Sequence, residues 1–133
     1  MTQYIIILIS LLIFVLSPFK ASSQSTFQEL PECVVLTHCV FEEWPVNNLE
    51  ISFKKAVAAV ADTPRTTILE QTDFFIHAEA KTKWRKYTDD LLLLALPDKG
   101  IIQVRSESRV GIGDNGVNKK RVDNLAYRLI TDQ

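Results

Sequence analysis

Four strand-like segments follow one another in the middle of this chain, and the connections between them are short. The segment 88–96 is apolar on both faces through Leu91 to Leu94, and it ends at the turn 97–100, Pro-Asp-Lys-Gly. Strands joined by such short connections pair antiparallel, because a parallel pair needs a crossover of roughly a dozen residues or more. The expected strands are residues 65–71, 74–83, 88–96 and 101–110. The sequence therefore predicts a four-stranded antiparallel sheet.

Segments with helical periodicity flank the expected sheet. Residues 49–62 carry apolar side chains at helical spacing. Residues 118–130 repeat the pattern, with Asn118 placed to cap the helix. Residues 24–48 contain two prolines and no clean period, so we expect an irregular lead that carries both cysteines. The order predicts a single two-layer α+β domain over residues 49–133, α-β-β-β-β-α, with both helices on one face of the sheet.

The N-terminus carries an apolar run over residues 5–16 that is broken only by Ser10. A helix that spans a bilayer needs about 20 apolar residues, so this run fits the apolar core of a secretory signal peptide better. We expect a signal peptide over residues 1–23, cleaved between Ser23 and Gln24, and an exported protein that is periplasmic or secreted. The alternative is an uncleaved membrane anchor, because the first four residues include no basic side chain.

The charge of the chain is balanced overall but unevenly distributed. Its 15 basic and 16 acidic residues give a net charge of −1, which argues against a nucleic-acid partner. Residues 24–80 contain nine acidic and three basic side chains, whereas residues 81–133 contain eleven basic and seven acidic ones. An anionic partner is therefore expected to bind the C-terminal half.

The segment 81–87, Lys-Thr-Lys-Trp-Arg-Lys-Tyr, is the most basic stretch and includes two aromatic residues. Its candidates for contact with a membrane surface are Lys83, Trp84, Arg85 and Lys86. The alternative is a solvated loop in which Trp84 folds back on the core.

Cys33 and Cys39 lie six residues apart, and in an exported chain this spacing favours a disulfide. The alternative is a metal or redox site that includes His38. A structural zinc site needs four ligands and no fourth one is evident, so we expect no metal and no cofactor.

Residues 111–116 spell G-x-G-x-x-G between an expected strand and an expected helix. A dinucleotide site is excluded because the chain ends too soon after Gly116 for a second parallel strand. The backbone N–H groups of this loop could instead cradle an anion, with Lys119, Lys120 and Arg121 nearby. The alternative is a tight turn whose glycines supply positive φ angles.

Alternation along the last strand places Arg105, Glu107 and Arg109 on one face, with Ser106 and Ser108 on the core side. Pairing across the 97–100 turn puts Asp90 opposite Glu107, and His77 and Glu79 share that face. One interpretation is a catalytic site in which His77 and Asp90 act as base and orienting carboxylate beside an arginine clamp. The other is a set of cross-strand ion pairs that fixes the register. The second is favoured because no hydroxyl or thiol is clearly placed beside His77.

Residues 105–121 fill every fixed position of the pattern R-S-x-S-R-x-G-x-x-D-x-G-x-N-x-x-R, and the chain thereby resembles domain-of-unknown-function family 1499. Further likenesses are the Cys33/Cys39 spacing, the Pro64-Arg65-Thr66 start of the first expected strand, and His77-Ala78-Glu79 followed by Asp89-Asp90. The resemblance covers about residues 30–130 and implies a fold and a set of positions, but no activity. Members often carry an acidic residue where this chain has Leu92, which puts two-metal or carboxylate-pair chemistry in doubt. The resemblance adds the thylakoid lumen as a second address beside the periplasm.

Two functions from different classes are consistent with these features. The first is a non-enzymatic exported module that binds an anionic ligand, a lipid headgroup or a protein partner. Its expected binding residues are Arg105, Arg109, Asp114, Asn118 and Arg121, with Asp89 or Asp90 ordering the arginines. Leu92 and Leu94 make part of the sheet apolar, which suggests a cover: the lead, a second copy or a partner. The second function is a small hydrolase that uses His77 and Asp90.

Overall fold

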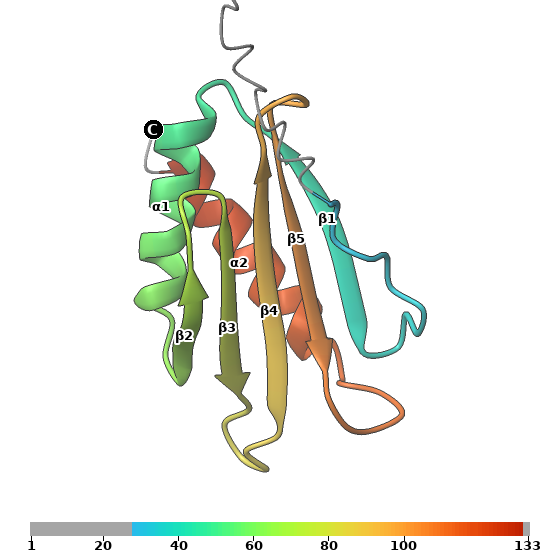
Figure 1. Cartoon of the computed structure of the whole chain (residues 1–133). Coiled ribbons are helices and arrows are strands. Elements are labelled where there is room, and N and C mark those ends of the chain that lie inside the picture. Colours follow the sequence, from blue (N-terminus) through green and yellow to red (C-terminus); the bar gives the residue numbers. More distant parts are fainter. Residues whose placement is uncertain (1–27, 132–133) are drawn as a thin grey trace, which may run out of the picture.

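The computed structural model describes residues 28–131. Its elements are β1 (Cys39–Pro45), α1 (Leu49–Ala61), β2 (Thr66–Gln71), β3 (Phe75–Lys81), β4 (Thr88–Leu96), β5 (Ile101–Ser108) and α2 (Val117–Thr131). Both helices lie on one face of a five-stranded antiparallel sheet (Figure 1), which confirms the two-layer α+β architecture. The expected signal peptide lies outside the described residues. Neither helix of the described part is long and apolar enough to cross a membrane.

The sheet contains one strand more than predicted, and the additional strand is β1. This part of the expected irregular lead pairs with β5 along the edge of the sheet. The strand was missed because an acidic residue interrupts its apolar alternation on the helix side. That residue, Glu42, accepts a hydrogen bond from Trp44 Nε1 at 3.0 Å and lies 3.4 Å from Lys119 Nζ. Pro45 is tolerated because it ends an edge strand.

The other four strands form the predicted meander. The sheet order is β1-β5-β4-β3-β2, so every neighbouring pair from β2 to β5 is also consecutive in sequence. Leu96 pairs with Ile101 across the 97–100 turn, and this register places Asp90 opposite Glu107, as predicted. A short turn fixes the register, and the register fixes which side chains share a face.

The main hydrophobic core lies between the sheet and the two helices. Its largest fully buried apolar side chains are Val60, Ile76, Leu91, Leu93, Ile102, Val104 and Val122. Each side chain of this kind contributes about 1.5–3 kcal/mol through burial. The helices pack on this side of the sheet. The opposite side, which we call the open face, carries charged side chains and a second, smaller apolar cluster.

The lead covers one end of the open face. Leu92, Leu94 and Leu96 alternate onto this face, and buried Leu30 packs in the same cluster. The backbone N–H of Leu30 donates to Oε1 of Gln103, which is fully buried, at 2.8 Å. Of the three covers considered from the sequence, the structure places the lead here.

Three loops come together at one end of the molecule, which we call the loop end (Figure 1). They are residues 33–38 before β1, 82–87 between β3 and β4, and 109–116 between β5 and α2. Their shared position follows from the sheet register. Cys33 and Cys39 close the first of these loops with a disulfide, with 5.6 Å between their Cα atoms.

Candidate functional site

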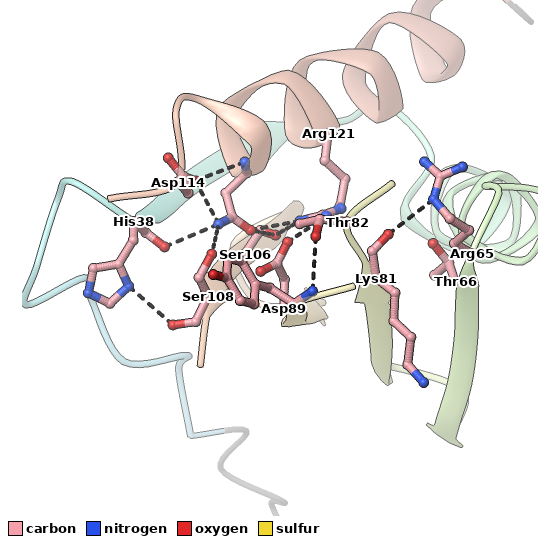
Figure 2. A network of polar contacts seen from close by, with 12 residues as sticks. His38, Arg65, Thr66, Lys81, Thr82, Asp89, Ser106, Ser108, Asp114 and Arg121 are labelled. Atoms are coloured by element: carbon pink, nitrogen blue, oxygen red, sulfur yellow. Dashed lines mark hydrogen bonds and ion pairs between the residues drawn. The ribbon is translucent and has the colours of Figure 1, made fainter. Parts of the chain in front are cut away.

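Residues of the 105–121 segment form a buried polar network between α2 and the sheet (Figure 2). Arg121 reaches down from α2, and its Nη2 donates to Oδ2 of Asp89 at 2.7 Å. Its Nη1 donates to Ser106 Oγ at 3.0 Å and to Asn118 Oδ1 at 2.7 Å. Asp89, Ser106 and Asn118 are fully buried. These side chains therefore fasten α2 to β4 and β5.

Asn118 is the central member of this network. Its Oδ1 accepts a hydrogen bond from Ser106 Oγ at 2.6 Å. Its Nδ2 donates to Ser108 Oγ at 2.9 Å, to Asp114 Oδ2 at 2.7 Å and to the His38 carbonyl oxygen at 3.2 Å. An amide can do this because it both donates and accepts.

Asp114, rather than Asn118, caps the start of α2. Its carboxylate accepts the backbone N–H of Gly116 at 2.9 Å and that of Asn118 at 2.9 Å. Burial opposes the charged form, but hydrogen bonds from Asn118 and Gly116 lower the pKa of Asp114. An internal carboxylate thus already uses the donors that were expected to cradle an external anion.

The glycines of this loop fit the tight-turn interpretation. Gly111 and Gly116, the two that belong to the family pattern, have φ angles of +105° and +75°. Gly113 belongs to the G-x-G-x-x-G spacing alone, and its φ is not in the positive region. Positive φ is strained for residues with a Cβ, so the two pattern positions favour glycine for conformation.

The disulfide loop holds the 109–116 loop in place. The Thr37 carbonyl oxygen accepts the backbone N–H of Asp114 at 3.2 Å, and Thr37 Oγ1 donates to the Ile112 carbonyl oxygen at 2.5 Å. His38 adds a contact through Nδ1, 3.1 Å from the Ser108 carbonyl oxygen. The lead therefore fixes the loop that positions α2.

The sheet divides the expected binding residues between its two sides. Asp89, Asp114, Asn118 and Arg121 lie on the helix side, as described above. Asp90, Arg105 and Arg109 lie on the open face, because successive residues of a strand point to opposite sides. The structure therefore does not assemble the expected residues into one surface.

The charged side chains of the open face form a chain of ion pairs. Arg109 bonds both oxygens of Asp90, at 2.8 and 2.7 Å, and reaches Glu79 Oε1 at 2.6 Å. His77 Nε2 lies 2.7 Å from Asp90 Oδ1. Hydrogen bonds from Arg109 and then from His77 lower the pKa of Asp90 to about 2, against the effect of burial. Arg105 Nη2 pairs with Glu107 Oε2 at 2.6 Å.

These contacts bear on the hydrolase hypothesis. His77 and Asp90 do meet, as that hypothesis requires. However, Arg109 already holds both oxygens of the carboxylate, and within residues 28–131 the side chain of His77 makes no hydrogen bond to a hydroxyl or thiol. The same residues contain no cluster of three or more side chains suited to hold a metal ion. The geometry agrees with ion pairs that fix the register of β3, β4 and β5.

A groove of about 790 Å³ lies beside α2 at the loop end, and the sequence did not reveal it. We call it the basic groove. Its charged lining consists of Arg65, Lys81, Lys83, Arg85, Lys120, Arg121, Arg128 and one carboxylate, Asp114. Trp84, Tyr87 and Tyr127 contribute aromatic surface. From the sequence, the 81–87 stretch was expected to contact a membrane surface, and Lys120 and Arg121 were expected near an anion at the 111–116 loop. The sequence did not show that these segments line one groove, or that Arg65 and Arg128 join them.

Most of these cations form no ion pair with a carboxylate of residues 28–131. Arg121 is paired with Asp89, and Arg128 donates to Asp62 Oδ2 at 2.9 Å. Within residues 28–131, the other five form no ion pair with a carboxylate: Arg65, Lys81, Lys83, Arg85 and Lys120. The one groove carboxylate is committed to the cap of α2. The groove therefore presents a net positive field to solvent.

Local contacts hold two of the free cations at the groove. Arg65 has a φ angle of +59°, and its Nε donates to the Lys81 carbonyl oxygen at 3.1 Å (Figure 2). Arg85 Nη1 donates to the hydroxyl of Tyr87 at 3.3 Å. Both guanidinium groups keep further donors for a ligand, since each has five.

Comparison with protein-family models gives a match over residues 18–129 to the model described as Protein of unknown function (DUF1499). This range includes the disulfide, the sheet and nearly all of α2. A search of curated proteins finds no match to the chain.

Proposed function

The chain belongs to the DUF1499 family, and from this premise we propose that it is a non-enzymatic exported module that binds an anionic ligand in the basic groove. The observation that carries the proposal is the charge of the groove lining. Five cations that pair with no carboxylate of residues 28–131 line one hollow, whereas its single carboxylate is already hydrogen-bonded. Like charges held around a hollow repel one another, and an anion bound among them relieves that repulsion.

The lining also indicates the chemical class of the ligand. Arg65 and Arg85 carry planar guanidinium groups, which bind phosphate and carboxylate oxygens through two parallel hydrogen bonds. The aromatic side chains add an apolar wall. A volume of about 790 Å³ lies within the range of small-molecule sites. We therefore propose a phosphate- or carboxylate-bearing ligand with an apolar part.

The test uses two adjacent lysines that undergo the same change. Lys120 lines the groove, whereas Lys119 pairs with Asp123 and Glu42 outside it. Isothermal titration with pyrophosphate measures the affinity of the wild type, Lys120→Gln and Lys119→Gln at low salt. Loss of one charge-assisted hydrogen bond predicts an affinity about tenfold weaker for Lys120→Gln. Lys119→Gln keeps the wild-type affinity within about twofold. Equal affinities for the two variants would contradict the proposed site.

Export has its own support and its own test. The apolar run at residues 5–16 and the Cys33–Cys39 disulfide are typical of a secreted protein. The intact mass of the protein from its own host should correspond to a chain that begins at Gln24 and lacks the two hydrogens of the thiols. A mass that retains residues 1–23 would instead support the uncleaved anchor.

A further inference from the structure

The loop end concentrates the most exposed apolar side chains of the described residues. Ile112 is 92% exposed, Val34 91%, Trp84 85% and Leu36 79%, and no other large hydrophobic residue in the described range exceeds these values. All three loops contribute to this set. Single exposed apolar residues are ordinary on a protein surface, but four extreme ones at one end are not.

Internal contacts hold each of the loops that carry these apolar tips. The disulfide closes the 33–38 loop, and the two Thr37 hydrogen bonds tie this loop to the 109–116 loop. In the 82–87 loop, the backbone N–H of Tyr87 donates to Thr82 Oγ1 at 2.9 Å. The tips therefore project from a braced end of the molecule.

Cations accompany the tips. Trp84 is flanked by Lys83 and Arg85, and the Lys83 Nζ lies 5.1 Å from the centre of the Trp84 ring. The basic groove opens on the same end and brings Lys120. The acidic side chains of the loops are Glu32 at their margin and Asp114, which caps α2. Apolar tips with cations on the 82–87 loop and in the adjoining groove match a surface that is apolar inside and anionic at its boundary.

We propose that the loop end docks on an anionic phospholipid bilayer, with Leu36, Trp84 and Ile112 entering the interface. The headgroup phosphate occupies the basic groove, and this part of the inference rests on the proposed function. Tryptophan is enriched at the level of the headgroups, and lysine and arginine are attracted to anionic lipids. The apolar tips stand on three separate loops. A fluid interface accommodates such separate tips, whereas a protein partner would need a matching pocket for each.

The principal experiment compares two isoleucines at opposite ends of the molecule. Ile112→Ser alters the loop end. Ile130→Ser alters a 69% exposed residue at the C-terminal end of α2, which lies near Pro45 and Val46. Co-sedimentation of the full chain with vesicles of phosphatidylcholine containing about 30% phosphatidylglycerol measures the partition coefficient at low salt. Any contribution from residues 5–16 is common to both variants, so the difference between them isolates the loop end.

Ile112→Ser is expected to lower the partition coefficient about tenfold, because the variant no longer inserts an isoleucine side chain into the membrane interface. Ile130→Ser keeps the wild-type value. Pure phosphatidylcholine vesicles and raised salt should each weaken binding, by about fivefold per phosphate-contacting cation. The emission of Trp84, measured in a Trp44→Phe background, should shift to shorter wavelength on the anionic vesicles.

The outcomes separate this inference from the proposed function. Equal partition of the two isoleucine variants, or an unshifted Trp84 emission, overturns membrane docking even if pyrophosphate binds the groove. A third outcome is that Ile112→Ser weakens vesicle binding while Lys120→Gln and Lys119→Gln bind vesicles equally. This result would support the docking surface but overturn the groove as the site of the headgroup. Pyrophosphate binding without any vesicle binding leaves a site for a free anion and overturns docking.

Discussion

Removal of the buried carboxylate of Asp89 should strongly destabilise the fold. Asp89 is fully buried, and Arg121 is almost as inaccessible. In Asp89→Ala, the guanidinium of Arg121 stays buried without its counter-charge. Breaking a buried ion pair from one side costs about 3–5 kcal/mol. We expect about 3 kcal/mol, because Arg121 keeps its hydrogen bonds to Ser106 and Asn118.

The assay is urea unfolding of the purified protein with its disulfide intact, followed by circular dichroism. A domain of this size has a free energy of unfolding of about 5–15 kcal/mol, so the variant remains measurable. Asp62→Ala is the matched control, since it removes the carboxylate that pairs with Arg128 at the surface. That pair is largely exposed and should be worth less than about 1 kcal/mol.

A double-mutant cycle isolates the pair itself. Asp89→Ala combined with Arg121→Ala should destabilise by clearly less than the sum of the single changes, with a coupling of about 2 kcal/mol. Additive losses, or an Asp89→Ala cost as small as that of Asp62→Ala, would refute the interpretation of this network as the fastening between α2 and the sheet.

Two further predictions concern the open face and the loop before α2. Since Arg109 and His77 hold the pKa of Asp90 at about 2 in the folded state, below its ordinary value of 3.8, the unfolded chain takes up this proton first as the pH falls. The stability that Asp90 contributes above pH 3.8 is therefore lost between about pH 4 and pH 2, and Asp90→Asn should flatten the acid limb of the unfolding free energy; an unchanged slope would argue against the pairing. Gly116→Ala places a Cβ at a φ of +75° and should cost about 1–2 kcal/mol in the same urea assay, whereas Gly113→Ala meets only an ordinary 3.6 Å contact and should cost less. Equal costs would show that conformation is not the reason for glycine at position 116.

Local pattern predicted most of the fold. The 97–100 turn fixed the pairing of Leu96 with Ile101, so the register of β4 against β5 followed from sequence. Alternation also placed Ser106 and Ser108 on the helix side, where Asn118 bonds both of them. Predictions of this kind succeed when neighbours in space are neighbours in sequence.

The missed features depend on contacts between distant segments. Strand β1 pairs only with the last strand of the sheet, and its pattern is interrupted because Glu42 contacts Lys119 from α2. The basic groove combines Arg65, the 82–87 loop and Lys120, which no periodicity relates to one another. Strand alternation alone would have placed Asp89 and Asp90 on opposite faces of the sheet. The expected binding residues were nevertheless assigned to one surface, because most of them belong to one continuous sequence pattern, residues 105–121.

The edge position of β1 has a consequence for the order of folding. Its partner β5 lies far along the chain, and the contact of His38 with Ser108 spans 70 residues. Closing so long a loop costs conformational entropy, and this cost arises before the β1–β5 hydrogen bonds form and offset it. During synthesis, β1 has no strand to join until residue 108 has been made. The first strand of the sequence is therefore among the last to find its place in the sheet, and the loop that braces α2 is completed with it.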